Sequence, residues 1–124
     1  MLNVLAYGLA VVLSLFIVFI GVRFLTTPRN AAAGYGVPAS AGGAESAYLT
    51  VKGVRDLTYG LVGLALIAFT NADAVAWFML VVALAPVGDT VIVLRHGGTR
   101  AVAFGIHFAT ALVILLDAAL LFAL

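Results

Sequence analysis

The feature that most constrains this chain is the long apolar run at residues 2–25, which is broken only by Asn3 near its start and Arg23 near its end. About 20 apolar residues in a helix cross a hydrocarbon core of ~30 Å. The rest of the chain has the same character, since 65% of its 124 residues are hydrophobic and 9% are charged. A soluble domain carries roughly 25% charged residues. We therefore expect an integral membrane protein.

Three more apolar segments follow, at about residues 47–70, 74–94 and 101–124. A stretch rich in Gly, Pro and Ser separates the first two spans and predicts a loop, "NADA" predicts a tight turn, and "RHGGTR" predicts the last connector. Backbone polar groups in lipid must be hydrogen-bonded within their own segment, so the spans are expected to be helices. The first run has no preceding Lys or Arg and is longer than a cleavable signal sequence. The sequence predicts a single all-α domain over residues 1–124, a bundle of four transmembrane helices.

Basic residues indicate the orientation of this bundle. They flank the first and third connectors, as Arg23, Arg29, Lys52, Arg55, Arg95 and Arg100. The second connector has Asn71 and Asp73 and no basic residue. Because Lys and Arg favour cytoplasmic loops, we expect a multi-pass protein of the cell (inner) membrane with both termini outside.

Composition also limits the chemistry. The absence of Cys excludes disulfides, thiolate catalysis and sulfur-ligated metals, and a net charge of +1 argues against nucleic-acid binding. The two His residues show no metal-ligand spacing, and no GxSxG, HExxH or phosphate-cradling glycine loop is present. We predict neither a metal nor a cofactor.

Small residues are placed where helices can approach closely. They occur on the first segment (Ala6, Ala10, Ser14), the second (Gly53, Gly60, Gly63) and the fourth (Gly105, Ala109). A bundle this small has few residues with which to enclose a ligand, so we also expect a homodimer or a higher homo-oligomer. The expected partners are the lipid bilayer and a small lipophilic or anionic ligand.

The stretch "VKGVRDLTYGL" places charged residues inside the second apolar segment. At ~1.5 Å per residue, Arg55 lies about 12 Å, Asp89 about 9 Å and His107 about 12 Å from the same membrane side. A charge at the middle of a bilayer costs roughly 2.5–3.5 kcal/mol, and the cost falls when such groups face one another or a wet cavity. The shared depth on three helices predicts one intramembrane site.

Helical spacing assigns further residues to this site. Tyr48, Lys52, Arg55 and Tyr59 follow i, i+4, i+7 and i+11 on one stripe, with Asp56 beside it. Pro86 should kink the third helix one turn before Asp89. The predicted catalytic residues are Asp89, His107 and Asp56, and the predicted substrate-binding residues are Arg55, Lys52, Tyr59, Tyr48 and Arg23. Tyr7, Tyr35 and Trp77 are expected at the membrane interface or in packing.

Each of these residues also has a purely structural interpretation. Lys52 can extend to the membrane surface and matter only for topology. Arg55 can form an ion pair with Asp56 or Asp89 that locks helix packing. His107 can bond a backbone carbonyl in the core. Coincidence of depth favours a functional site, and its surplus positive charge predicts a ligand with a carboxylate, phosphate, enolate or phenolate.

The segments "GVRFLTTPRNAAAGYGVP", "YLTVKGVRDLTYGL" and "PVGDTVIVLRHGG", followed by a His in the last span, resemble a family of small membrane proteins known as domain of unknown function 4267. The most specific part is the core around Gly53, Arg55, Asp56 and Gly60. The resemblance covers most of the chain and implies a four-helix membrane fold. It brings no established activity, substrate or cofactor.

Two functions of different classes fit these residues. One is an enzyme that isomerises, cyclises or opens an epoxide in a small lipophilic substrate, with Asp89 or Asp56 and His107 as acid and base and Arg55 holding an oxyanion. The other is a proton-coupled transporter or exporter. A closed pocket that opens to the cytoplasm or to lipid and contains Arg55, Asp89 and His107 favours the enzyme. A water-filled path that reaches Asp117 favours transport, and a dry, fully paired network without a pocket favours a non-catalytic scaffold. The one-sided distribution of polar groups favours the enzyme.

Overall fold

The computed structural model describes residues 1–39 and 44–124, and within those residues it contains helices and no strands. The predicted all-helical fold is confirmed. The elements are α1 (Leu2–Thr26), α2 (Pro28–Tyr35), α3 (Ala44–Phe69), α4 (Ala72–Val82), α5 (Leu84–Arg95), α6 (Arg100–Val102), the π-helix η1 (Ala103–Phe108) and α7 (Ala109–Phe122).

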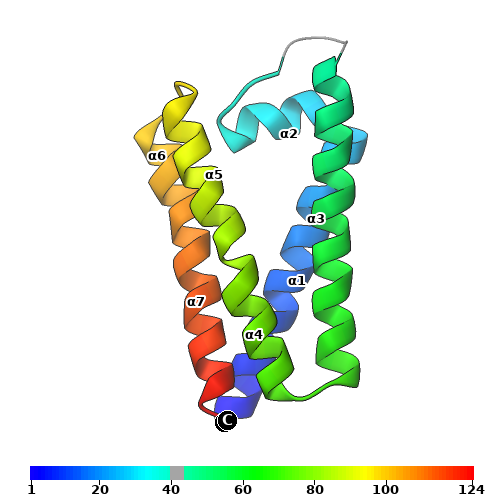
Figure 1. Ribbon diagram of the computed structural model, residues 1–124, viewed down its shortest axis with the longest axis vertical. Coiled ribbons are helices and arrows are strands. Elements are labelled where there is room, and N and C mark those ends of the chain that lie inside the picture. The colour runs from blue at the N-terminus through cyan, green and yellow to red at the C-terminus, as the bar shows by residue number, and fades with distance from the viewer. Residues whose placement is uncertain (40–43) are drawn as a thin grey trace.

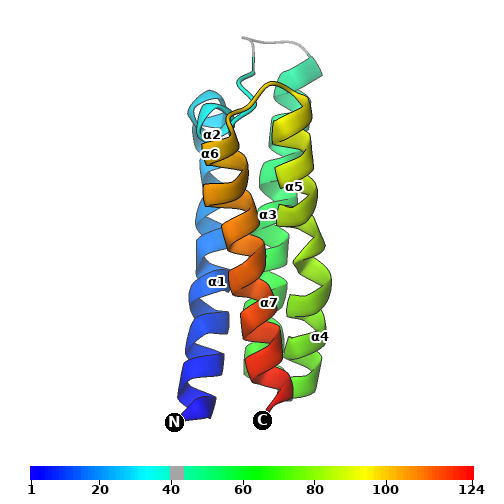
Figure 2. The ribbon, with the colours of Figure 1, turned by 90° about the vertical axis from the view of Figure 1, so that its left-hand side faces the viewer.

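The long helices run along one axis, and α2 lies across one end of them (Figure 1). Both chain termini lie at the opposite end (Figure 2). In the described part of the chain, three helical segments are long and apolar enough to cross a membrane: Leu2–Thr26, Ala72–Arg95 and Arg100–Phe122. Helix α3 has 26 residues, but Lys52, Arg55 and Asp56 lower its apolar character. The protein is therefore a helical membrane protein, and the fourth span stays a prediction.

The predicted loop between the first two spans is wrong in part, because it contains helix α2. Pro28 stands at the start of α2, where its missing N–H and fixed φ suit a first helical turn. Gly36 ends the helix with φ 103° and ψ 4°, a left-handed conformation that favours glycine. Pro and Gly here are the two boundaries of a short Ala-rich helix. Residues 40–43 of the predicted loop lie outside the described residues.

Helices α1 and α3 pack closely along a row of glycines. A Cβ on Gly60 would lie 2.6 Å from the carbonyl oxygen of Ser14 and 2.9 Å from the backbone nitrogen of Val18. A Cβ on Gly53 would lie 3.0 Å from the carbonyl oxygen of Gly21. The predicted close approach is thus present. It is absent at Gly105 within the described chain, where a Cβ would meet nothing within 4 Å.

Helices α4 and α7 form the other half of the molecule. Together with α1 they bury a small-residue core of Ala6, Ala10, Val75, Ala76, Met79, Ala118 and Leu121. Asn71 caps α4 by accepting a hydrogen bond of 3.0 Å from the backbone nitrogen of Ala74. The helical segment formed by α4 and α5 is interrupted at Ala83. Pro86 explains this interruption, since it has no N–H for the carbonyl of Val82. The expected kink at this position stays a prediction.

Candidate functional site

A cavity of about 610 Å³ lies between α1, α2, α3, α5 and η1. This volume is in the usual range for small-molecule sites, ~300–1,000 Å³. All the site residues predicted from sequence line this one cavity: Arg23, Tyr48, Lys52, Arg55, Asp56, Tyr59, Asp89 and His107. The structure therefore brings them together, and their individual roles remain predictions.

His107 reaches the cavity from the π-helix η1, an element that the sequence did not indicate. The backbone N–H of Ala109 bonds the carbonyl of Phe104, five residues earlier, as a π-helix requires. Such single-turn insertions often occur at functional sites because they redirect a side chain. The side chain of His107 is buried against α2 and α5. The local change in helix register thus fixes the imidazole at the polar end of the cavity.

The two ring nitrogens of His107 have different partners. Nε2 lies 2.7 Å from the backbone carbonyl oxygen of Tyr35. A carbonyl only accepts, so Nε2 carries a proton and donates it. Nδ1 lies 3.8 Å from Oδ2 of Asp89. The carbonyl bond expected for a structural histidine is therefore present, but it occupies one nitrogen and leaves the other facing a carboxylate.

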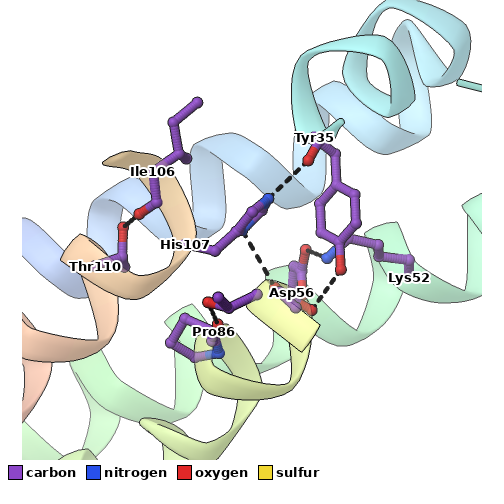
Figure 3. Close-up of polar contacts among 9 residues, drawn as sticks. Tyr35, Lys52, Asp56, Pro86, Ile106, His107 and Thr110 are labelled. Atoms are coloured by element: carbon purple, nitrogen blue, oxygen red, sulfur yellow. Dashed lines mark hydrogen bonds and ion pairs between the residues drawn. The ribbon is translucent and has the colours of Figure 1, made fainter. Parts of the chain in front are cut away.

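Tyr35 was not among the predicted site residues, yet it joins these groups. Its hydroxyl donates a hydrogen bond of 2.6 Å to Oδ1 of Asp89. Its ring lies beside that of His107, as Figure 3 shows, with 4.5 Å between the ring centroids. Burial, the hydrogen bond to Asp89 and the nearby carboxylate charges raise the pKa of Tyr35 well above its ordinary value. The phenol is consequently a hydrogen-bond donor at neutral pH.

A sequence signal for Tyr35 did exist. The segment between Pro28 and Gly36 is Ala-rich and carries helix boundary residues at both ends. Recognising α2 as a helix would have placed Tyr35 at its last turn, next to the left-handed Gly36. Its contact with Asp89 spans 54 residues of sequence and could not be read from spacing.

Lys52 and Asp56 form an ion pair one helical turn apart, with Nζ 2.8 Å from Oδ2. The ammonium also lies 4.9 Å and 5.0 Å from the ring centroids of Phe24 and Tyr35, within range of cation–π attraction. Lys52 therefore turns toward the site and does not extend to the membrane surface. The Lys52 pair takes the place of the predicted alternative in which Arg55 bonds Asp56.

Arg23 and Arg55 supply the remaining positive charge. Within the described part of the chain, neither guanidinium lies within 4.0 Å of a carboxylate, so the alternative pair between Arg55 and Asp89 is not formed. Arg55 is exposed at the rim on α3, and Arg23 is half-buried on α1. Since Lys52 and Asp56 neutralise each other, the cavity keeps a surplus of positive charge.

The other end of the cavity is apolar apart from the hydroxyl of Ser14. Its walls come from α1, α4 and α7, through Leu13, Ile17, Phe78, Met79, Val82 and Ile114. Asp117, further along α7, does not line the cavity, and its carboxylate is fully buried without a hydrogen-bond partner among the described residues. In the same residues, no cluster of three or more His, Asp or Glu side chains is placed to hold a metal ion.

The fold and the cavity define a class of protein: a helical membrane protein with an internal site that is charged at one end and apolar at the other. The chain belongs to the family described as "Domain of unknown function (DUF4267)", whose model matches residues 14–121. The resemblance seen in the sequence is thus confirmed. Comparison with curated proteins and with solved structures gave no match. Any function must therefore be argued from the site itself.

Proposed function

We propose that this protein is a membrane enzyme that transfers protons to and from a small lipophilic substrate with an anionic or oxyanion-forming group. Isomerisation, cyclisation and epoxide opening are the reactions of this type. The observation that carries the proposal is the placement of Asp89 beside Nδ1 of His107 in a ligand-sized cavity, with Tyr35 bonded to both residues.

Helix α3 is the fourth span in this proposal. Its 26 residues extend about 39 Å at ~1.5 Å per residue, more than a bilayer core requires. Its charged residues line the cavity, which lowers the cost of placing them at that depth. With the basic connectors at the α2 end, the cavity faces the cytoplasm and both termini lie outside.

Asp89 and His107 are the acid–base pair. The hydrogen bond from Tyr35 orients Oδ1 of Asp89 and leaves Oδ2 directed toward Nδ1 of His107. A base must come within hydrogen-bond reach of the proton that it removes, about 2.6–3.2 Å. Nδ1 of His107 can take a proton from one atom of a bound substrate and return it to another, while the carboxylate of Asp89 stabilises the imidazolium formed in between. The bond from Nε2 to the Tyr35 carbonyl holds the imidazole in the tautomer whose Nδ1 is free to accept.

The cations stabilise the negative charge that forms when the proton leaves. Arg55 and Arg23 have no carboxylate partner among the described residues, so they are available to an oxyanion. The apolar walls lower the local dielectric, and this strengthens the attraction. Lys52 is neutralised by Asp56, so its role is to hold neighbouring side chains in place and not to attract an anion. Asp56 is thereby assigned an orienting role, and Tyr48 and Tyr59 contact the substrate at the rim.

Two observations support the enzyme over the alternatives. A transporter needs polar groups along the whole path, whereas the cavity ends in apolar side chains and does not include Asp117. A scaffold would pair its charges, whereas both cavity arginines are unpaired within the described residues.

Proton transfer can be tested before the substrate is identified. Purified protein is incubated in D₂O with a lipid extract of the native host, and deuterium incorporation into individual compounds is followed by mass spectrometry. We expect wild type to label at least one compound and the Asp89→Asn and His107→Gln variants to do so about 100-fold more slowly. Asp73→Asn, at the far end of the molecule, is the matched control. Labelling that is equally fast in all variants, or absent in wild type, would contradict the proposal.

A further inference from the structure

The two ends of the cavity differ in a way that specifies the shape of its ligand. We propose that the site binds a single-chain anionic amphiphile, with its charged group at Arg55 and Arg23 and its hydrocarbon chain in the apolar half. We further propose that this ligand enters sideways from the lipid, between α3 and α5. The inference rests on the same site as the proposed function and adds the substrate class and its route.

The charged end accommodates one anionic group. Lys52 is already neutralised by Asp56, and the remaining charged lining residues are Arg55, Arg23 and Asp89, so the cavity keeps one surplus positive charge. A guanidinium presents planar N–H donors that fit a carboxylate or a phosphate. Asp89 and His107 line the same cavity, so an acid bound there shares it with the proposed acid–base pair.

The apolar end has the dimensions of a hydrocarbon chain. Lining residues extend from Arg23 to Leu13 on α1 and from Asp89 to Phe78 across α5 and α4. At ~1.5 Å per residue, both intervals correspond to roughly 15 Å along the helix axis. The hydroxyl of Ser14 is the polar group at this end, and it has no hydrogen-bond partner among the described residues. A chain that lies here replaces lipid contacts with contacts to Met79 and its neighbours.

The cavity has exposed lining residues on its α3 and α5 side. On α3 the lining residues Tyr48, Val51, Arg55 and Tyr59 are exposed, and on α5 Ile92 is exposed as well. Helices α3 and α5 diverge toward the α2 end (Figure 1). Across that end, α2 is held in place by the two hydrogen bonds of Tyr35. The side between α3 and α5 is therefore the route for a lipophilic molecule.

Binding to a graded series of ligands tests this inference. The protein in phosphatidylcholine nanodiscs is titrated with straight-chain carboxylates from butanoate to hexadecanoate, with alkyl phosphates, and with the matching alcohols, and binding is measured by native mass spectrometry. We expect affinity to rise with chain length until the apolar half is filled and then to level off. Alcohols should bind about tenfold more weakly or worse, as expected for loss of a charge-assisted hydrogen bond. Whichever series binds more tightly, the carboxylates or the alkyl phosphates, identifies the headgroup.

Variants separate the two ends of the site. Arg55→Gln should weaken all anions by about tenfold at every chain length, and Arg95→Gln, outside the cavity, should have no effect. Met79→Trp should move the preferred length to shorter chains, and Ile114→Phe, on α7, should do the same if Met79→Trp does not fold.

Three results would overturn the inference: equal affinity for alcohols, no dependence on chain length, or stronger binding of two-chain phosphatidylglycerol. Chain-length-dependent binding without deuterium transfer would remove the proposed enzyme and leave this inference intact. Deuterium transfer to compounds that have neither a hydrocarbon chain nor an anionic group would remove this inference and leave the proposed enzyme intact.

Discussion

The two faces of helix α3 show how one helix serves packing and chemistry at once. One face carries glycines so close to α1 that an added Cβ would contact the α1 backbone, at 2.6 Å in the case of Gly60. The neighbouring face carries Lys52 and Arg55 into the cavity, and Asp56 lies between the two faces, one helical turn from both Gly53 and Gly60. The backbone of α3 is thus fixed on one side, while space is left on the other.

This difference indicates what holds the site together. A helix in lipid gains little from hydrophobic burial, and it gains most from close backbone approach between small residues. We call the contact of Gly53 and Gly60 with the α1 backbone the glycine seam. This seam sets the depth and rotation of α3 in the bundle, and thereby the position of the charged side chains of α3. Positioning of this kind matters for catalysis, since small displacements of reacting groups have large effects on rate.

The largest expected effect comes from filling the seam. Gly60→Val adds a branched side chain where Ser14 and Val18 backbone atoms lie within 3 Å of the new Cβ, so α1 and α3 must separate. We expect a loss of about 3 kcal/mol or more in unfolding free energy, measured in detergent by denaturant titration. Gly8→Val is the matched control, since Gly8 lies in the regular α-helix α1, where an added Cβ meets nothing within 4 Å and the intrinsic helix cost is the same. Equal losses in the two variants would contradict the importance of the seam.

On the cavity-lining face of α3, Lys52 and Arg55 should behave differently. Lys52→Met leaves the buried carboxylate of Asp56 without its partner, and we expect a loss of about 2 kcal/mol. Arg55→Met removes a side chain without a carboxylate partner in the described residues, and it should leave stability unchanged. The double variant Lys52→Met with Asp56→Leu should recover most of the loss. A double variant as unstable as Lys52→Met alone would show that the pair is not what stabilises this face.

Asp117 tests whether polar groups away from the cavity have a role. Its carboxylate is fully buried, and no described residue bonds it. Asp117→Leu should therefore increase unfolding free energy by about 1 kcal/mol, because it removes the cost of burying an unbonded polar group. Binding of long-chain carboxylates should not change. If Asp117→Leu abolished proton-coupled uptake into proteoliposomes, the site would belong to a transporter.

The smallest effect is spectroscopic and concerns Tyr35, which lies outside the candidate spanning helices. Its pKa is raised from the ordinary value of 10.0, so the folded state keeps this proton as pH rises while an unfolded chain loses it. The stability that Tyr35 contributes is accordingly present below pH 10 and decreases above it. Ionisation of the tyrosine side chains is followed by phenolate absorbance as pH rises. In Tyr35→Phe this ionisation should be complete at a lower pH than in wild type. Identical end points would mean that the phenol is not held by Asp89.

The sequence predicted the helical membrane fold because apolar length and backbone hydrogen bonding leave few alternatives. It also predicted which side chains line the cavity, because depth along a helix follows directly from residue number. Arg55, Asp89 and His107 come from separate segments, yet each was placed at one level by counting residues.

Other features depend on contacts that counting does not reveal. Helix α2 was mistaken for a loop because Pro28 and Gly36 mark helix ends as well as turns. The hydrogen bonds of Tyr35 depend on how α2 folds over the cavity. The π-helix around His107 leaves no pattern in the residues that form it. The partner of Asp56, by contrast, follows from spacing: Lys52 is one helical turn away on the same face, whereas the adjacent Arg55 points in another direction.

The central claim is that His107 and Asp89 act as one unit organised by Tyr35, and side-chain NMR measures this directly. The chain contains two His residues, so ¹⁵N-histidine labelling with His96→Gln as a reference assigns His107 without ambiguity. We predict that neutral His107 carries its proton on Nε2, and that the Nδ1 resonance shifts in Asp89→Asn and, less strongly, in Tyr35→Phe. A proton on Nδ1 in the neutral form, or an Nδ1 resonance unchanged by Asp89→Asn, would contradict the claim.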